Sequence, residues 1–169
     1  HYLYEYIALA IPARRVPCEI DETNFVRHTT KSGLTDNYIT CLQQDDEGFV
    51  WIGTDGGLNR YDGNSFEKIF ASSGAFSLLS ANIWRINKMG NGRLGILGKG
   101  GFQLLTTKNL RTTDFIVTKG EPFSSYQNAS WDAISLPDKT LGLTTATGFY
   151  VFDSTGKMLY RYDAYRQQD

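Results

Sequence analysis

Two tryptophans and an arginine are the side chains of this sequence best suited to binding a small polar molecule. Trp84 is followed directly by Arg85, and Trp131 stands further along the chain. An indole presents a flat apolar face on which a sugar ring can stack, and a guanidinium donates hydrogen bonds to hydroxyl or anionic groups. These three residues are therefore candidate ligand-binding residues. The alternative, which the sequence favours for Trp84, is packing between neighbouring elements of the fold.

Acidic side chains give weaker indications of metal binding or acid–base chemistry. Residues 45–47, Asp-Asp-Glu, could attract Ca²⁺, but they lack the alternating ligands of a calcium-binding loop and are better explained as a hairpin turn. Asp132 and Asp138 could act as an acid/base pair only in a pocket that perturbs their pKa values. The sequence shows no sign of such a pocket, so we expect no catalytic residues.

Histidine, cysteine and glycine form no recognisable site. His1 and His28 are the only histidines, and neither has the neighbours that a zinc or catalytic site requires. Cys41 falls in an apolar strand pattern and is expected to be a buried free thiol. A disulfide between Cys18 and Cys41 is the alternative in an oxidising compartment. The glycine-rich residues 53–57 precede no helix, which a phosphate-binding loop needs. The sequence therefore predicts no metal and no cofactor.

Composition and charge exclude two further classes. The chain has 17 Lys and Arg against 18 Asp and Glu, and the basic residues are spread along it rather than clustered as in nucleic-acid binders. Its longest apolar run, residues 6–11, is much shorter than the roughly 20 residues that span a bilayer. We therefore expect neither nucleic-acid binding nor membrane insertion within this chain. Aromatic residues make up 14%, and 17 glycines accompany them, which suits short strands joined by tight turns.

An internal repeat organises the sequence. Residues 37–62 align with residues 81–106 without a gap, at an offset of about 44 residues. A third copy, residues 131–153, aligns if one residue is deleted in the turn around residues 137–139. Each copy shows four short strand patterns separated by Gly-rich or Asp-rich turns. Four short antiparallel strands at this period are typical of a β-propeller blade.

The positions that define the repeat are turn glycines and large apolar or aromatic strand residues. They are Gly48, Trp51, Gly53, Gly57, Leu58, Tyr61, Gly101, Phe102, Gly148 and Phe149. We therefore predict an all-β fold, namely a partial β-propeller of about three four-stranded antiparallel blades that is open rather than closed. The predicted blades cover residues 33–72, 77–120 and 124–165 within a propeller region of residues 31–169. Residues 1–30 form an N-terminal extension that includes a closing-type strand at residues 24–28.

The first copy carries a specific resemblance to a known family. Residues 33–39, GLTDNYI, and residues 45–63, DDEGFVWIGTDGGLNRYDG, resemble the two-component regulator propeller repeat. In the other two copies Gly95 and Gly142 stand where Trp51 does. The resemblance implies a non-catalytic periplasmic sensor region that precedes a membrane helix and a histidine kinase. In hybrid two-component systems of Bacteroidetes such regions sense oligosaccharides, so an oligosaccharide ligand is expected, and Trp51 is expected to be a scaffold residue.

The pattern at the C-terminus adds an expectation about association. Residues 165–169 resemble residues 28–32, which precede Gly33, so we expect a truncation at a repeat boundary. Three blades cannot close a ring, and their outer faces would expose apolar rows to water. We therefore predict self-association, with two chains building a ring of six or seven blades. The alternative functions are a structural or oligomerisation fragment without a small-molecule ligand and, disfavoured, a propeller glycan-active enzyme.

Overall fold

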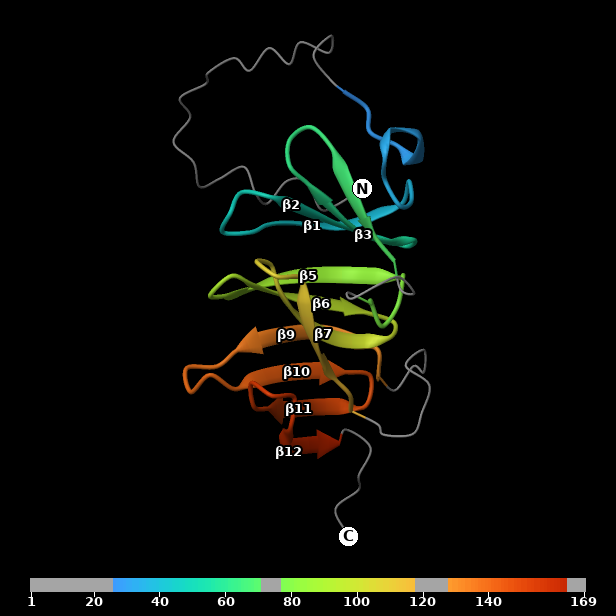
Figure 1. Ribbon diagram of the computed structural model, residues 1–169. Helices are drawn as coiled ribbons and strands as arrows, with labels where there is room; N and C mark the ends of the chain where they lie inside the picture. The colour runs from blue at the N-terminus through green and yellow to red at the C-terminus, as the bar shows by residue number, and fades with distance from the viewer. Residues whose placement is uncertain (1–25, 71–76, 118–127, 164–169) are drawn as a thin grey trace, which may run out of the picture.

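The computed structural model describes residues 26–70, 77–117 and 128–163. Its strands form three four-stranded antiparallel sheets, which succeed one another as stacked blades (Figure 1). Blade 1 consists of β1 (Ile39–Gln44), β2 (Val50–Thr54), β3 (Gly57–Tyr61) and β4 (Phe66–Ile69). Blade 2 consists of β5 (Ile83–Gly90), β6 (Arg93–Gly98), β7 (Gly101–Thr106) and β8 (Arg111–Phe115). Blade 3 consists of β9 (Ser130–Ser135), β10 (Leu141–Thr145), β11 (Gly148–Phe152) and β12 (Met158–Asp163).

Each blade is a simple meander, in which the order of strands in the sheet follows their order in the chain. The first strands of successive blades lie together, because β1 packs beside β5 and β5 packs beside β9. The first strand is therefore the inner strand of each blade, as in a propeller. The described residues include one short 3-10 turn, η2 (Thr30–Ser32), before blade 1. The predicted all-β fold of open, four-stranded propeller blades is confirmed.

The first three strands pair in the same register in all three blades, and this register corrects one detail of the predicted repeat. The innermost hairpin closes over the same number of residues in every blade, with the pairs Gln44–Val50, Lys88–Leu94 and Ser135–Leu141. The deletion predicted around residues 137–139 is therefore wrong. The first three strands of blade 3 follow those of blade 1 at a constant offset of 91 residues, so equivalent positions in these strands can be read directly along the chain.

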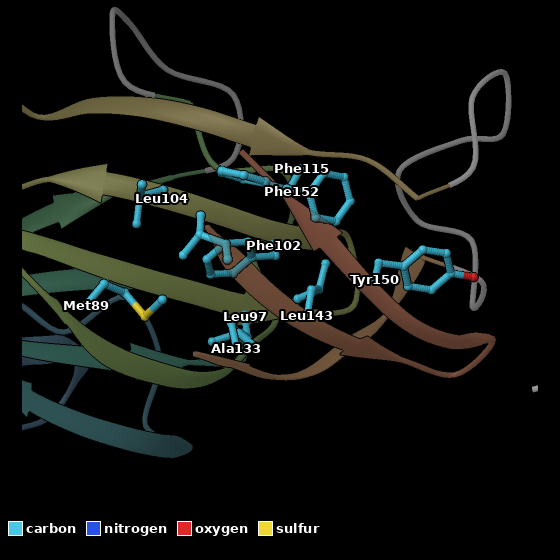
Figure 2. Close-up of a cluster of buried hydrophobic side chains, with 10 residues drawn as sticks. Met89, Leu97, Phe102, Leu104, Phe115, Ala133, Leu143, Tyr150 and Phe152 are labelled. Atoms are coloured by element: carbon cyan, nitrogen blue, oxygen red, sulfur yellow. The ribbon is translucent and has the colours of Figure 1, made fainter. Parts of the chain in front are cut away.

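Two hydrophobic clusters fill the spaces between the blades. The first joins blades 1 and 2, and Trp51 and Ile83 lie in it. The second joins blades 2 and 3 and is built around aromatic rings (Figure 2). In it the ring centroids of Phe115 and Phe152 lie 5.3 Å apart, edge to face, across the two blades. The strands of blade 2 are apolar on both faces because blades 1 and 3 bury both of its faces.

A change of residue type at the Trp51 position has a packing explanation. Gly95 and Gly142 occupy that position in blades 2 and 3. A Cβ atom on Gly95 would lie 2.7 Å from the Phe102 ring, and one on Gly142 would lie 3.2 Å from the Phe149 ring. In these two blades the glycine makes room for an aromatic ring from the neighbouring strand. Each blade thus keeps one large ring at this place, supplied by β2 in blade 1 and by the third strand in blades 2 and 3.

The backbone conformation explains why each blade has a glycine at the start of its third strand. Gly57, Gly101 and Gly148 have φ angles of 145°, 128° and 156°. Residues with a side chain rarely adopt such angles. These glycines therefore allow the backbone conformation of the hairpin turn between the second and third strands. Of the strand predicted over residues 24–28, residues 24 and 25 lie outside the described residues, and Val26–His28 has no regular secondary structure.

Candidate site on the inner strands

The structure brings Trp84 and Trp131 together, although they lie on different blades. Their ring centroids are 5.0 Å apart and their planes make an angle of 19°, so the two indoles stack. Trp84 is the second residue of β5 and Trp131 the second residue of β9, which are the inner strands of blades 2 and 3. Trp131 is 48% exposed. The stack therefore offers indole surface to a ligand.

A β-bulge sets the direction of both tryptophans. The pairing of the inner strand with its neighbour shifts register at the second residue in every blade, which leaves Thr40, Trp84 and Trp131 without a ladder partner. A bulge bends the strand and re-aims the side chain of the extra residue. The three residues are thus equivalent positions of the repeat. The sequence alignment placed Trp84 at the Thr40 position but missed Trp131, because the assumed deletion shifted blade 3 by one residue.

Polar side chains that follow the tryptophans connect the same two strands. Arg85 Nη1 lies 3.1 Å from Asp132 Oδ2, forming an ion pair. Asn87 donates from Nδ2 to Asp132 Oδ1 at 2.7 Å and to the carbonyl oxygen of Ala133 at 2.9 Å. The sequence analysis identified Arg85 but missed Asn87, and it considered Asp132 only as a member of an acid/base pair with Asp138. Alignment of the inner strands at their bulges would have identified Asn87 and the role of Asp132.

The environment of Asp132 argues against a role as a general acid. Burial raises its pKa, but the hydrogen bonds from Asn87 and from the backbone of Ala133, together with the charge of Arg85, outweigh that effect and hold the pKa below its ordinary value. Asp138 lies in the β9–β10 turn, where its carboxylate accepts hydrogen bonds from the hydroxyl and backbone N–H of Thr140. These bonds also lower the pKa of Asp138. The two carboxylates thus have separate partners and do not form an acid/base pair.

The acidic residues 45–47 belong to a turn that is tied into the blades. Asp45 is buried, and its carboxylate accepts hydrogen bonds from Trp51 Nε1 at 2.7 Å and from the backbone N–H of Phe49 at 3.0 Å. Asp46 reaches blade 2, where it pairs with Lys88 Nζ at 2.6 Å. Within the described ranges, no group of three His, Cys, Asp or Glu residues could hold a metal ion.

The remaining predicted positions are separate from the stack. His28 is exposed, and its ring centroid lies 5.0 Å from that of Phe66. Cys41 is a free, half-buried thiol, and burial raises its pKa. His1 and Cys18 lie outside the described residues. The part of the chain that the structure describes contains no helix long and apolar enough to cross a membrane.

One hollow of about 220 Å³ lies on blade 1, away from the tryptophans. Its lining includes Phe49, Arg60 and Glu67. The Arg60 guanidinium lies over the Phe49 ring at 4.6 Å and pairs with Glu67 at 2.8 Å. Asp62, the third charged residue of the lining, accepts hydrogen bonds from the backbone N–H groups of Asn64 and Ser65. The charged groups of this hollow therefore already have partners, and the tryptophan stack is the better candidate site.

Comparison with known proteins agrees with this architecture. The profile of the two-component regulator propeller family matches residues 33–56, which include the inner strand of blade 1. No curated protein matches the chain. Among solved structures, the extracellular domain of a hybrid two-component system from B. thetaiotaomicron is similar over 82% of this chain, with 23% identity and a TM-score of 0.67. The similar region makes up 20% of that protein, so the chain spans about a fifth of its length.

Two further solved structures share the fold. PorZ, a surface component of the type-IX secretion system of Porphyromonas gingivalis, is similar over 76% of this chain and 16% of its own, with 14% identity and a TM-score of 0.56. A catalytically inactive virginiamycin B lyase from Staphylococcus aureus is similar over 80% of this chain and 44% of its own, with 11% identity and a TM-score of 0.55. These likenesses concern the fold, which hosts both catalytic and non-catalytic proteins. Together with the profile match, they identify this chain as an open segment of β-propeller whose first blade carries a two-component regulator propeller repeat.

Proposed function

We propose that this chain is a non-catalytic, ligand-binding segment of the extracytoplasmic sensor region of a two-component regulator, and that its ligand is a neutral oligosaccharide. The profile match on residues 33–56 and the likeness to the extracellular domain of a hybrid two-component system support the sensor role. In a protein of that kind, a periplasmic propeller would pass the binding event to a histidine kinase carried by another part of the polypeptide.

The stack of Trp84 and Trp131 is the observation that carries the ligand assignment. About half of Trp131 is exposed, so part of its indole is accessible to a sugar ring. A hydrophobic sugar face packs on an indole as other flat apolar groups do. A ligand that covers this indole surface would remove apolar area from water, which favours binding.

The polar groups beside the stack suit hydroxyl groups better than a charged ligand. Arg85 offers donors, the Asp132 carboxylate offers acceptors, and the two lie 3.1 Å apart. Their charges cancel, so the site has no net attraction for an anion or a cation. Adjacent donors and acceptors match the hydroxyl groups of a sugar, each of which both donates and accepts. A neutral oligosaccharide therefore fits this cluster better than an acidic one.

Calorimetric titration with a panel of neutral and acidic oligosaccharides tests the proposal. The expected result is saturable binding of at least one neutral oligosaccharide and a loss of affinity of at least tenfold in W131A. Tyr160→Ala is the matched control, because Tyr160 is an exposed aromatic residue of the outer face of blade 3. Circular dichroism should show that both variants keep the fold. Binding that is equally strong in W131A, or preferred binding of acidic oligosaccharides, would contradict the proposed site.

A further inference from the structure

The two oxygens of the Asp132 carboxylate have different partners. Oδ1 accepts hydrogen bonds from Asn87 Nδ2 at 2.7 Å and from the backbone N–H of Ala133 at 2.9 Å. Oδ2 lies 3.1 Å from Arg85 Nη1. Because each carboxylate oxygen has about two acceptor sites, Asn87 and Ala133 fill those of Oδ1. Oδ2 keeps one acceptor site in addition to the one that Arg85 uses.

Arg85 supplies unused donors beside this acceptor. A guanidinium carries several N–H groups in a planar fork. Among the residues that the structure describes, only Asp132 forms an ion pair with the Arg85 side chain. The side chains of Arg85 and Asp132 are 52% and 48% exposed. Water, or a polar ligand in its place, can therefore reach a free donor and a free acceptor that lie next to each other.

The ion pair and the tryptophan stack lie at neighbouring positions of the same two strands. Trp84 and Trp131 are the bulge residues of β5 and β9, and Arg85 and Asp132 directly follow them. Consecutive Cα atoms are about 3.8 Å apart, so the ion pair is one residue away from the stack on both strands. A ring that covers part of an indole is thus close enough for its substituents to contact Arg85 and Asp132.

The equivalent positions of blade 1 carry other residue types. Thr40 occupies the bulge of β1, and Cys41 follows it at the position of Arg85 and Asp132. Thr40 offers no aromatic face, and Cys41 offers no carboxylate. Within the three described blades, the aromatic stack and the donor–acceptor pair therefore occur together at one junction, between blades 2 and 3. This coincidence favours a joint role in one site.

Two hydroxyl groups on neighbouring carbons of a sugar ring match the donor–acceptor pair. When such groups are gauche, their oxygens lie about one hydrogen-bond length apart, close to the 3.1 Å between Arg85 Nη1 and Asp132 Oδ2. A hydroxyl group both donates and accepts. One of the two hydroxyls can thus accept from the guanidinium while its neighbour donates to Oδ2. Equatorial hydroxyls on non-adjacent carbons are too far apart for this arrangement.

We propose that Arg85 and Asp132 bind two adjacent hydroxyl groups of one sugar unit, and that Asn87 is a positioning residue that directs Asp132 Oδ2 toward them. The inference rests on the proposed function and specifies its ligand class. A chain is recognised through a unit whose linkages leave two neighbouring ring hydroxyls free. Units whose linkage occupies the hydroxyl between the other two are not recognised, because no adjacent pair remains on the ring.

Calorimetric titration with cellotetraose and laminaritetraose tests this selectivity, since both are neutral, β-linked glucose chains of equal length. Internal units of cellotetraose keep an adjacent pair of ring hydroxyls, and those of laminaritetraose keep none. The other neutral oligosaccharides of the panel are sorted by the same criterion. The class with adjacent hydroxyls should bind at least tenfold more tightly. Equal or tighter binding of the other class would overturn the inference alone, whereas binding of no neutral oligosaccharide would overturn the proposed function and the inference with it.

Variants separate recognition of the hydroxyl pair from stacking on the indole. R85Q and D132N should reduce the preference between the two classes at least fivefold, whereas W131A should weaken both classes and keep their ratio. N87A should also reduce the preference, because the carboxylate loses a hydrogen bond that fixes Oδ1. A wild-type preference in R85Q or D132N would overturn the recognition of the pair, and one in N87A would overturn the positioning role.

R161Q is the matched control for the loss of a guanidinium. Arg161 Nε lies 3.3 Å from Asp163 Oδ2, and the Arg161 side chain is 49% exposed, much as Arg85 is. This ion pair lies on β12, away from the inner strands. R161Q should keep the wild-type affinity and preference, and circular dichroism should show the wild-type strand content in all variants. A loss of preference in R161Q would mean that charge in general, and not the Arg85–Asp132 pair, sets the selectivity, which would overturn the inference.

Discussion

The indole rings of Trp84 and Trp131 stack at 5.0 Å and 19°, although 47 residues separate them in the chain. Each ring projects from the bulge of its own inner strand, and packing of β5 beside β9 brings the two bulges together. The contact therefore serves two purposes. It joins blade 2 to blade 3 and it presents the aromatic surface of the proposed ligand site.

The stack should stabilise the fold in a way that depends on both rings. We expect W84A and W131A each to lower the free energy of unfolding, and the double variant to lose less than the sum of the two. Aromatic pairs contribute about 0.5–1.5 kcal/mol beyond their buried area, which is the expected coupling energy. Urea denaturation of the four proteins measures it. Strict additivity would mean that the rings pack independently.

The ion pair of Arg85 and Asp132 should make the contact between blades 2 and 3 sensitive to acid. The folded state holds the pKa of Asp132 below the value of about 3.9 in an unfolded chain. The resulting stabilisation is fully present above that unfolded value and is lost as the pH falls through the folded pKa. Because the Asp132 side chain is 48% exposed, solvent screening limits the effect to at most about 1 kcal/mol.

Titration of the Asp132 carboxyl group by NMR checks this assignment. In R85Q the pKa of Asp132 should rise toward its ordinary value, because the charge of Arg85 is one of the causes that lower it. D132N should remove the corresponding part of the acid sensitivity from urea denaturation curves recorded between pH 7 and pH 3. An unchanged Asp132 titration in R85Q would show that the ion pair is absent in solution.

Gly95 should tolerate no side chain while Phe102 remains. The Cβ atom of G95A would lie 2.7 Å from the Phe102 ring, so we expect a loss of about 1–3 kcal/mol from overpacking. Adding F102L, which gives blade 2 the Leu found at that position in blade 1, should recover part of the loss. The double variant should lie roughly 0.5–3 kcal/mol above the additive expectation.

Gly142 provides the matched comparison for the overpacking argument. A Cβ atom there would lie 3.2 Å from the Phe149 ring, and Phe149 is 42% exposed, so its ring has room to move. G142A should therefore cost clearly less than G95A in chemical denaturation. Equal costs would mean that the loss comes from the strand backbone and not from the clash with the ring.

Asp45 should be the most important acidic residue of blade 1 for stability. D45A would leave Trp51 Nε1–H, whose side chain is fully buried, without its acceptor. An unsatisfied buried donor costs about 1–3 kcal/mol, so the melting temperature should fall by several degrees. D138A is the control, since Asp138 caps an exposed hairpin turn through Thr140 and should matter little. Similar melting temperatures for D45A and D138A would contradict this role.

Local sequence signals predict the strands and turns of this fold well. The Asp-rich and Gly-rich turns end the strands where the structure places them, because backbone conformations such as the positive φ of Gly57 depend on the residue at that position. The period of about 44 residues between the first two copies predicts the blades, because the turn residues and the apolar strand residues recur together at this spacing. The distribution of apolar residues along a strand reflects which of its faces are buried, and in blade 2 both faces are buried.

The equivalence of Trp131 with Trp84 could not be predicted from local sequence signals. Weak similarity in the third copy allowed a deletion in the turn, and only the pairing of β9 with β10 shows that none is needed. The roles of Asn87 and Asp132 depend on a contact between strands about 45 residues apart, which no local pattern encodes. Local patterns also do not show that Phe102 supplies in blade 2 the aromatic ring that Trp51 supplies in blade 1.

The sequence by itself determined that this chain folds into propeller blades, and residues 33–63 determined which family its first blade resembles. These properties follow from turn chemistry and strand periodicity, which act over a few neighbouring residues. Only the tertiary structure decided that Trp84 and Trp131 face each other and that Arg85 pairs with Asp132. Such relationships depend on strand register and on the stacking of blades, because a shift of one residue turns a side chain to the opposite face of the sheet.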